Sequence, residues 1–385
     1  MARRWSINGR FVTQSLTGVQ RCGHELLKAL DQHVADGHPL TKDLDLELIV
    51  PKQAQAIPEL KAIRVRRFGS AKGHTWEQCM LPFGVKGGLI SLCSTGPIAV
   101  RKQVVCVHDL NTRLIPGSFS IPFRALYRVL IPALGRSAET ITTVSHFSAD
   151  QLAGYGAVTR DKIVVIGNGH EHALAWKAEH SDKTRAVAGP NTIVVFGTGS
   201  PNKNVGMLVA MAEQLAKANL RLAVAGATDL RVFSAGTDIP ASDAVTFLGR
   251  LTDGEISALL QDCLCLAFPS FVEGFGLPPV EAMVLGCPVV VSSSTCLPEI
   301  CRDAALYASP TKPAAWLDQF IRLRDTPALR ETMIERGLKR ADNYRWSVSA
   351  ERYLSLMTES DARKRGAGNR QAPLLPSSSG ASGHV

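Results

Sequence analysis

No stretch of this sequence approaches the ~20 consecutive apolar residues that a membrane-spanning helix requires. The first ten residues, Met-Ala-Arg-Arg-Trp-Ser-Ile-Asn-Gly-Arg, also lack the apolar segment of a secretory signal peptide. Both absences predict a cytoplasmic protein that meets a membrane only peripherally, at its inner face. The mean hydropathy of +0.05 and the hydrophobic content of 45% still leave ample apolar material for a globular core.

A disulfide framework is also missing. The nine cysteines are odd in number, and several lie in apolar segments typical of buried strands, where thiols stay reduced (Cys106, Cys263, Cys265, Cys287). No second ligand pair follows Cys263 and Cys265, which argues against a zinc site. The sequence has no zinc finger, RNA-binding signature or basic helix, so nothing in it supports nucleic-acid binding.

Positive charge is distributed unevenly along the chain. The 385 residues carry 43 Lys+Arg against 34 Asp+Glu, a formal net charge of +9. Residues 1–170 hold 21 basic and 12 acidic side chains, whereas residues 171–385 hold 22 of each. The basic first half suits an anionic membrane surface or a lipid diphosphate.

The length predicts two domains, because it exceeds one typical core. Short apolar runs alternate with helical stretches in both halves, the pattern of α/β domains with doubly wound parallel sheets. The predicted strands are Trp5–Ile7, Leu46–Val50, Ile90–Leu92, Val104–Val107, Thr140–Val144, Ile163–Ile166, Thr192–Phe196, Arg221–Val224, Val245–Leu248, Cys263–Phe268 and Pro288–Val291.

Composition also suggests domain boundaries. Residues 1–176 form the first predicted domain and residues 190–345 the second, joined by a polar segment with Ala, Gly and Pro. Residues 346–360 read as a final helix. From residue 363 the chain becomes rich in Ser and Gly, which cannot build a core, so residues 363–385 are expected to be a disordered tail.

The most informative motif places Glu273 and Glu281 eight residues apart, after the buried strand Cys263–Phe268. Gly274 and Gly276 allow a sharp turn, and two prolines suit the first turn of a helix. The N-terminus of that helix is suited to a phosphate. With Glu281 in the first turn, its carboxylate can reach ribose hydroxyls, while Glu273 can reach those of a sugar. Together they predict a sugar-nucleotide site.

This arrangement resembles the E-x7-E motif of retaining glycosyltransferase family 4, which has the GT-B fold of two facing Rossmann-like domains. The resemblance extends from about Ile7 to Met357. It implies that Glu281 holds the ribose, that Glu273 lies near the donor sugar, and that backbone groups between them contact sugar and phosphate. The residues that would supply these backbone contacts are Gly274, Phe275, Gly276 and Leu277.

A second loop, Gly197-Thr-Gly199-Ser-Pro-Asn-Lys203, follows the strand Thr192–Phe196 and lacks the G-x-x-x-x-G-K pattern of a Walker loop. It resembles the diphosphate loop of family 4, which implies that Lys203 neutralises the leaving diphosphate. Many members carry an arginine in this loop, and this chain does not. Arg250 can compensate, or it is simply a solvent-exposed side chain.

In the first half, His108 ends the strand Val104–Val107. A histidine at a strand end of this cleft suits proton transfer or contact with donor sugar and acceptor. The alternative is a polar turn in which Asp109 acts as a cap. Gly18 and Arg21 follow the first strand and are candidates for acceptor or phosphate binding, unless this glycine serves a turn alone.

Ser145 either lines the cleft or caps the following helix. The string Asp43-Leu-Asp45 matches the D-x-D of metal-dependent glycosyltransferases, but it precedes its strand and so lies at the wrong end of the sheet. His170-Glu-His172 lacks a nearby third ligand and is interpreted as a surface turn. The helical stretch 120–134 has apolar residues at helical spacing and is either a helix packed on its own sheet or a membrane-facing one.

By resemblance, we expect retaining transfer through front-face attack, with the departing diphosphate accepting the proton of the acceptor hydroxyl. No cofactor or metal is expected beyond the sugar-nucleotide co-substrate, with GDP-mannose favoured over a UDP-hexose. The expected acceptor is a saccharide, lipid-linked in exopolysaccharide or O-antigen assembly. A sugar-nucleotide epimerase or hydrolase and a non-catalytic sugar-nucleotide-binding protein are the alternatives, although the first needs an acid–base pair that His108 alone does not provide.

Overall fold

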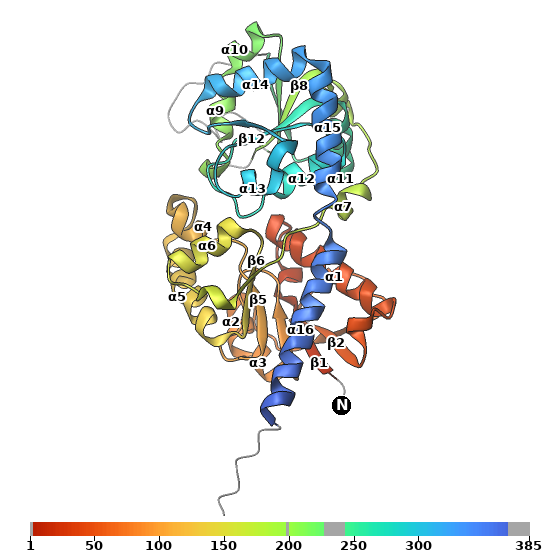
Figure 1. Ribbon diagram of the computed structural model, residues 1–385, viewed down its shortest axis with the longest axis vertical. Helices are drawn as coiled ribbons and strands as arrows, with labels where there is room; N and C mark the ends of the chain where they lie inside the picture. The colour runs from red at the N-terminus through yellow and green to blue at the C-terminus, as the bar shows by residue number, and fades with distance from the viewer. Residues whose placement is uncertain (1–2, 198–199, 227–242, 369–385) are drawn as a thin grey trace, which may run out of the picture.

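The computed structural model describes residues 3–197, 200–226 and 243–368 and contains two parallel sheets (Figure 1). The N-terminal sheet has seven strands in the order β3-β2-β1-β4-β5-β6-β7. Their bounds are β1 Arg3–Asn8, β2 Leu44–Val50, β3 Arg64–Arg67, β4 Gly88–Ser91, β5 Gln103–Cys106, β6 Thr140–Thr143 and β7 Ile163–Val165. Strands β4, β5 and β6 are buried at every position, as their apolar or β-branched sequences require.

The C-terminal sheet has six strands in the order β10-β9-β8-β11-β12-β13. Their bounds are β8 Gly189–Phe196, β9 Arg221–Ala225, β10 Val245–Gly249, β11 Cys263–Phe268, β12 Val289–Ser292 and β13 Leu306–Ala308. Every strand pair in both sheets is parallel. This agrees with the predicted fold class of two doubly wound domains.

Helices cover both sheets (Figure 1). Those of the N-terminal half are α1 Gly18–Ala35, α2 Gly73–Cys79, α3 Leu81–Gly84, α4 Asn111–Leu114, α5 Ile121–Ser137 and α6 His146–Gly154. The later ones are α7 Glu171–Leu174, α8 Asp182–Arg185, α9 Val205–Val209, α10 Ala212–Lys217, α11 Asp253–Asp262, α12 Leu277–Val284, α13 Leu297–Cys301, α14 Pro313–Asp325, α15 Pro327–Ala341 and α16 Trp346–Gly368. Among the described helices, none is long and apolar enough to cross a membrane.

The chain passes between the two halves twice. After the connection through α7 and α8 it builds the C-terminal sheet, and α16 then returns along the N-terminal half beside α1 (Figure 1). Asp361 of α16 anchors this return by accepting hydrogen bonds from Arg3 (2.7 Å) and from the indole of Trp5 (3.1 Å). Tyr353 adds a buried hydrogen bond to Thr142 at 2.8 Å.

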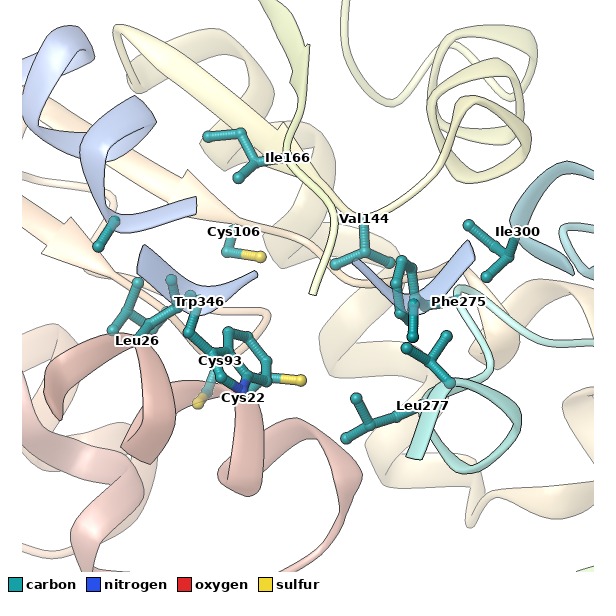
Figure 2. Packing of buried hydrophobic residues seen from close by; sticks show 14 of the residues in the cluster. Cys22, Leu26, Cys93, Cys106, Val144, Ile166, Phe275, Leu277, Ile300 and Trp346 are labelled. Carbon is teal, nitrogen blue, oxygen red and sulfur yellow. The ribbon is translucent and has the colours of Figure 1, made fainter. Parts of the chain in front are cut away.

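One apolar cluster continues across the junction between the halves. Figure 2 shows Val144 and Ile166 from the N-terminal half in the same cluster as Phe275, in the loop after β11, and Leu277, the first residue of α12. Burial of such side chains stabilises by about 25 cal/mol per Å² of apolar surface. The two halves are therefore held together by packing as well as by the two connections.

Three features differ from the sequence prediction. Strand β3, Arg64–Arg67, was not predicted, because its basic and mostly exposed sequence lacks any apolar run. Strand β13 is only three residues long and was also missed. The predicted end of the last helix at residue 360 is wrong, since α16 continues to Gly368 and includes the first residues of the predicted tail. Residues 369–385 lie outside the described part of the chain.

Candidate active site

The loops after β8 and β11 meet at the topological switch point of the C-terminal sheet. These strands are neighbours, while the chain moves outward from each to a different side. Ligands of open parallel sheets bind beyond the carboxyl ends of strands at such a point. Lys203 follows β8 and Glu273 follows β11, and Lys203 Nζ donates to Glu273 Oε1 at 2.7 Å. The structure thus brings together two residues predicted for donor binding.

Asn202 ties these two loops together. Its side chain donates to the Val272 carbonyl at 2.7 Å and accepts from the Val272 amide at 3.0 Å. Its own carbonyl accepts from the Phe271 amide at 2.9 Å. The residue is buried and holds Lys203 in place relative to Glu273. Asn202 therefore has a structural role in the loop that lacks the arginine found in many members of family 4.

Gly274 is where the C-terminal loop touches the N-terminal half. Its carbonyl accepts hydrogen bonds from Ser145 Oγ at 2.6 Å and Ser148 Oγ at 3.3 Å. A Cβ at Gly274 would lie 2.7 Å from the His108 carbonyl oxygen and 3.1 Å from Asp109 Cβ. Only a residue without a side chain permits this approach. Ser145 also caps α6 by accepting from the Ser148 amide at 3.1 Å, so both interpretations of it hold.

His108 is buried and Asp109 is half-buried, and the charges of Lys203 and Glu273 both act on the Asp109 carboxyl. His108 Nε2 bonds the Leu92 carbonyl at 2.8 Å. Burial favours the neutral ring, yet the neighbouring Cys106 sulfur and the Leu92 carbonyl raise the pKa of His108 above the ordinary histidine value. Burial, together with the Glu273 carboxylate, raises the pKa of Asp109.

Asp109 also forms the predicted turn, because its Oδ1 accepts from the amide of Asn111 at 2.9 Å. The cap and the position beside Lys203 and Glu273 are therefore both real. Glu299, which sequence reasoning missed, reaches across from α13 and accepts from the amides of His146 and Phe147 at 2.8 and 3.1 Å. A carboxylate at the start of α6 complements the positive end of that helix.

Glu281 is buried within α12 and bonds His172, whose Nε2 lies 2.8 Å from Oε1 of the glutamate. The helix begins at Leu277, so Glu281 is its fifth residue, and the prediction of a first-turn position is wrong. The first turn contains no acidic residue. The carboxylate instead lies in the second turn, against the connection between the two halves.

The interpretation of residues 170–172 as a surface turn is also wrong. His170 and His172 are buried, and Glu171 binds the start of α16. These residues follow β7 at the carboxyl edge of the N-terminal sheet, which is the criterion that selected His108 and was available in the sequence. Their burial was not, because the partners lie more than 100 residues away in Glu281 and Trp346.

Arg21 bridges the two halves from the first turn of α1. Its guanidinium forms a two-pronged ion pair with Asp253 at 2.8 and 3.2 Å and lies 5.4 Å from the ring centre of Trp176. Burial works against the charge of Arg21, but Asp253 and Glu281 raise its pKa. Gly18, at the start of the same helix, faces open space with nothing within 4 Å of a built Cβ.

The remaining predicted donor residues fall into different settings. Gly276 adopts a positive φ of 89° at the start of α12, a conformation that favours glycine. Phe275 and Leu277 are buried, and Phe275 packs edge-on against Tyr344 at 5.2 Å, so only their backbone groups remain for a donor. Arg250 is exposed, and among the described residues its side chain forms no hydrogen bond or ion pair.

Gly197 closes onto the neighbouring strand, since its amide donates to the Ala225 carbonyl at 2.7 Å. Gly199 lies outside the described residues. Within the described ranges, no group of three His, Cys, Asp or Glu side chains could hold a metal ion.

Two cavities lie away from the Lys203–Glu273 pair, at the N-terminal half and at the connection between the halves. One of about 580 Å³ lies at the carboxyl ends of β1 and β2 and is lined largely by hydroxyl and amide side chains (Thr13, Gln14, Ser15, Gln53, Gln55) and by Lys72. The other, about 680 Å³, runs between α1 and the connection and is lined by Arg21, His172, Trp176, Asp253 and Trp346, among others.

Residues 177–340 match the family described as "Glycosyl transferases group 1". This match covers the half of the chain that carries Lys203, Glu273 and Glu281. The chain contains a glycosyl transferase group 1 domain and is a glycosyltransferase, as the sequence predicted.

Among characterised proteins, the chain is similar to "O-antigen chain mannosyltransferase RfbU" of Salmonella typhimurium. The two are 27% identical over 250 residues, which cover 64% of this chain and 68% of that protein. It is also 29% identical over 268 residues to "O-antigen chain mannosyltransferase B" of Escherichia coli, covering 65% of this chain and 68% of the relative. The resemblance to bacterial mannosyltransferases is therefore confirmed.

Solved structures place the fold. Sucrose-phosphate synthase from Thermosynechococcus elongatus superposes with a TM-score of 0.65 at 16% identity, covering 95% of this chain and 100% of the other. WaaG, a glycosyltransferase involved in lipopolysaccharide biosynthesis, gives 0.65 at 14% identity, covering 92% and 99%. The predicted GT-B fold is confirmed.

Proposed function

We propose that this glycosyltransferase moves a mannosyl group, with retention of configuration, from GDP-mannose to a hydroxyl of a lipid-linked saccharide in bacterial polysaccharide synthesis. The observation that carries the proposal is the Lys203–Glu273 pair at the switch point, which lies close enough to Asp109 for both charges to act on its carboxyl. The names of the O-antigen mannosyltransferases similar to this chain support mannose as the sugar.

In this proposal the donor diphosphate lies between Lys203 and the start of α12. Pro278 and Pro279 carry no N–H, so the free backbone donors at the start of this helix are the amides of Gly276 and Leu277. They add the positive end of the helix dipole to the charge of Lys203. Glu273 exchanges its bond with Lys203 for bonds to sugar hydroxyls when the donor enters.

The chemistry follows from what the carboxylates already do. Retention through a covalent intermediate needs a free carboxylate as nucleophile. Glu273 bonds Lys203, Glu281 bonds His172, and Asp109 accepts from the Asn111 amide. We therefore favour attack on the same face from which the diphosphate leaves. The bond from the anomeric carbon to the acceptor oxygen forms, the bond to the phosphate oxygen breaks, and the hydroxyl proton passes to the departing diphosphate.

The cavity of about 580 Å³ beyond β1 and β2 is the proposed acceptor site. Its amide and hydroxyl side chains match the alternating donors and acceptors of a saccharide. Gly18 and Arg21, at the start of α1, lie between this loop and the C-terminal half. Gly18 leaves room for a substrate there, because nothing occupies the space around it.

A lipid-linked acceptor requires the enzyme to reach a membrane, and α5 offers a face for this. Leu130, Ile131 and Leu134 pack on the sheet, as one interpretation of this stretch predicted. The preceding turns nevertheless expose apolar side chains to solvent (Ile121, Phe123, Leu126, Val129). Phe83 of α3 is 84% exposed, and the neighbouring α2 contacts α5 through His74 and Tyr127. We name the exposed side chains of α5 and Phe83 the apolar face.

Charge supports an anionic bilayer as the partner of this face. Residues 78–138 contain seven Lys and Arg residues and a single acidic residue, the half-buried Asp109. A basic surface with exposed apolar side chains is the combination that binds anionic lipid headgroups. Residues 78–138 thus account for +6 of the net charge of +9 that residues 1–170 carry.

Donor binding and transfer test the proposal in sequence. GDP, UDP, GDP-mannose and UDP-glucose are compared by calorimetry, and GDP-mannose is then supplied with bacterial lipid-linked oligosaccharide. We expect tighter binding of the guanine nucleotides, transfer of mannose, and an α-linked product by NMR. Donor hydrolysis that no acceptor diverts would identify a hydrolase instead. Tight binding of the uridine nucleotides alone would show that the donor is a UDP-sugar and not GDP-mannose. A β-linked product would exclude retention of configuration.

A further inference from the structure

Two segments cross between the halves of the molecule and touch. Gly169 lies so close to the second segment that a Cβ there would be 2.0 Å from the amide nitrogen of Trp346. His170 Nδ1 bonds the Tyr344 carbonyl at 2.6 Å. Glu171 accepts from the amides of Trp346 and Ser347 at 2.7 and 3.2 Å. Burial raises the pKa of this carboxyl, but these amide bonds lower it further than burial raises it.

His172 connects this crossing to Glu281. The indole N–H of Trp346 donates to His172 Nδ1 at 2.9 Å. An indole nitrogen can only donate, so Nδ1 carries no hydrogen and accepts. The ring hydrogen is then on Nε2, which donates to Glu281 Oε1 at 2.8 Å. Both ring nitrogens of His172 are therefore engaged in hydrogen bonds. Trp346 donates to His172, and His172 donates to Glu281.

All three side chains are buried, so the chain of hydrogen bonds has little competition from water. Trp346 and His172 also contact through their rings, with centroids 5.9 Å apart. His172 holds Oε1 of Glu281, and because the carboxylate is planar and rigid, the position of Oε1 also fixes the direction in which Oε2 points. The rotation of the Glu281 carboxylate is thus set by a histidine of the connection and a tryptophan at the start of α16.

We propose that His172 is a positioning residue for Glu281, which it holds through Oε1 so that Oε2 meets the ribose hydroxyls of the donor nucleotide. The inference rests on the proposed function, to which it adds the ribose contact that the resemblance to glycosyltransferase family 4 implies for Glu281. It adds that the nucleotide site is completed by the crossing between the halves and not by the C-terminal half alone. Ribose recognition is therefore coupled to the arrangement of the two halves.

The test compares each nucleotide with a form that lacks the ribose hydroxyls. GDP, UDP and their 2′,3′-dideoxy forms are titrated into the full chain by calorimetry. His172→Phe keeps an aromatic ring and removes both hydrogen bonds, while His172→Gln retains a donor and an acceptor. Trp346→Phe removes only the donor to Nδ1 and serves as a second route if His172→Phe does not fold. Exposed His146 on α6 supplies a control, His146→Phe.

In the wild type we expect the affinity for the better-bound nucleotide to exceed the affinity for its dideoxy form by about tenfold or more. Hydrogen bonds to a charged group contribute about 1.5–3 kcal/mol. His172→Phe should weaken the ribose form by about 10–100-fold and leave the dideoxy form unchanged, so that their ratio falls towards one. His172→Gln should restore most of the ratio, and Trp346→Phe should lower it partly. His146→Phe should preserve it.

If His172→Phe weakens the binding of the ribose form and of the dideoxy form by the same factor, the inference is overturned. A residue that only maintains the structure would affect the affinity for both forms equally. A wild type that binds nucleotide without regard to the hydroxyls would overturn it as well and leave the proposed function standing. If the wild type binds neither GDP nor UDP, the proposed function fails, and this inference fails with it.

Discussion

Lys203 Nζ and Glu273 Oε1 lie 2.7 Å apart, in loops that follow neighbouring strands 70 residues apart in the chain. The pair is partly buried, with 28% of the lysine and 12% of the glutamate side chain exposed. Each side chain thus holds the other in place. In the proposed function the ammonium binds the diphosphate of the donor and the carboxylate binds its sugar hydroxyls, so this one contact would orient the groups for both ends of the donor.

Lys203→Met should abolish most of the transfer activity. Electrostatic groups that stabilise the leaving charge contribute about 2.7–4 kcal/mol, so kcat is expected to fall by about 10²–10³. Initial rates with labelled GDP-mannose measure this. Lys217→Met is the matched control, because Lys217 pairs with Glu213 at 2.6 Å on the exposed surface of α10. Wild-type kcat in Lys203→Met would remove this lysine from the mechanism.

Gly274→Ala should separate donor binding from turnover. The added Cβ would lie 2.7 Å from the His108 carbonyl oxygen, so the two halves cannot keep their present contact. We expect donor affinity to change little and kcat to fall by about 10–100-fold, as displacement of reacting groups by about 1 Å does. Gly154→Ala on α6 is the control, because nothing lies within 4 Å of its Cβ. Equal kcat in the two variants would show that this contact does not matter for turnover.

Much of the site follows from local sequence. The strand Cys263–Phe268 has the same bounds as predicted, because a short apolar run between polar segments admits few alternatives. Strand ends then identify the loops, and the rule that ligands bind there selects Lys203, Glu273 and His108 together. Ser145 illustrates the limit of such reasoning, since one hydroxyl both caps α6 and bonds Gly274, and sequence offered these as alternatives.

Residues whose role depends on distant partners could not be predicted. The local sequence around His172 predicts a surface residue, because its partner Trp346 lies 174 positions later in the chain. Strand β3 likewise depends on a partner, because Arg66 is held by two hydrogen bonds of 2.8 Å to Glu47 on β2. Tertiary contacts override local propensity in both places. The predicted end of the last helix, at residue 360, differs from the observed end of α16 at Gly368 for another reason. Helix ends are poorly marked in sequence.

Thr252→Ala should destabilise the C-terminal half by about 1 kcal/mol, the usual value for loss of an N-cap. Thr252 caps α11 in a capping box, accepting from the Glu255 amide at 3.2 Å while Glu255 accepts from the Thr252 amide at 2.8 Å. Urea unfolding at pH 7, followed by tryptophan fluorescence, measures the change. No loss of stability would mean that the box does not persist in solution.

The same capping box predicts a pH dependence. The Ser181 hydroxyl and the Thr252 amide lower the pKa of Glu255 from its ordinary value of 4.5 to about 2. Because the folded pKa is lowered, the stabilisation is complete above pH 4.5 and is lost as pH falls towards 2. Glu255→Gln should therefore be less stable than wild type at pH 7 and approach it between pH 4.5 and 2. Glu213→Gln, in an exposed pair, should change little at either pH.

The apolar face of α5 should bind anionic membranes. Val129 is 68% exposed and Leu126 41% exposed, in a region with a large excess of basic residues. Vesicles of phosphatidylglycerol and phosphatidylcholine should sediment the wild type, and 0.5 M salt should release much of it, since screening weakens the basic contribution. Replacing both side chains with serine should lower vesicle binding by about tenfold or more, because each loses part of the 1.5–3 kcal/mol of a buried aliphatic group.

Two exposed aliphatic residues elsewhere make a matched control for this pair. Val348 is 58% exposed on α16 and Leu338 45% exposed on α15, so Val348→Ser with Leu338→Ser removes similar apolar area away from α5. That control should bind vesicles like the wild type, and both double variants should retain transfer to a water-soluble acceptor. Equal loss of vesicle binding in the two double variants would show that the apolar face is not a specific membrane-binding surface. Equal binding to pure phosphatidylcholine would remove the role of charge, because the apolar side chains alone would then account for the attachment.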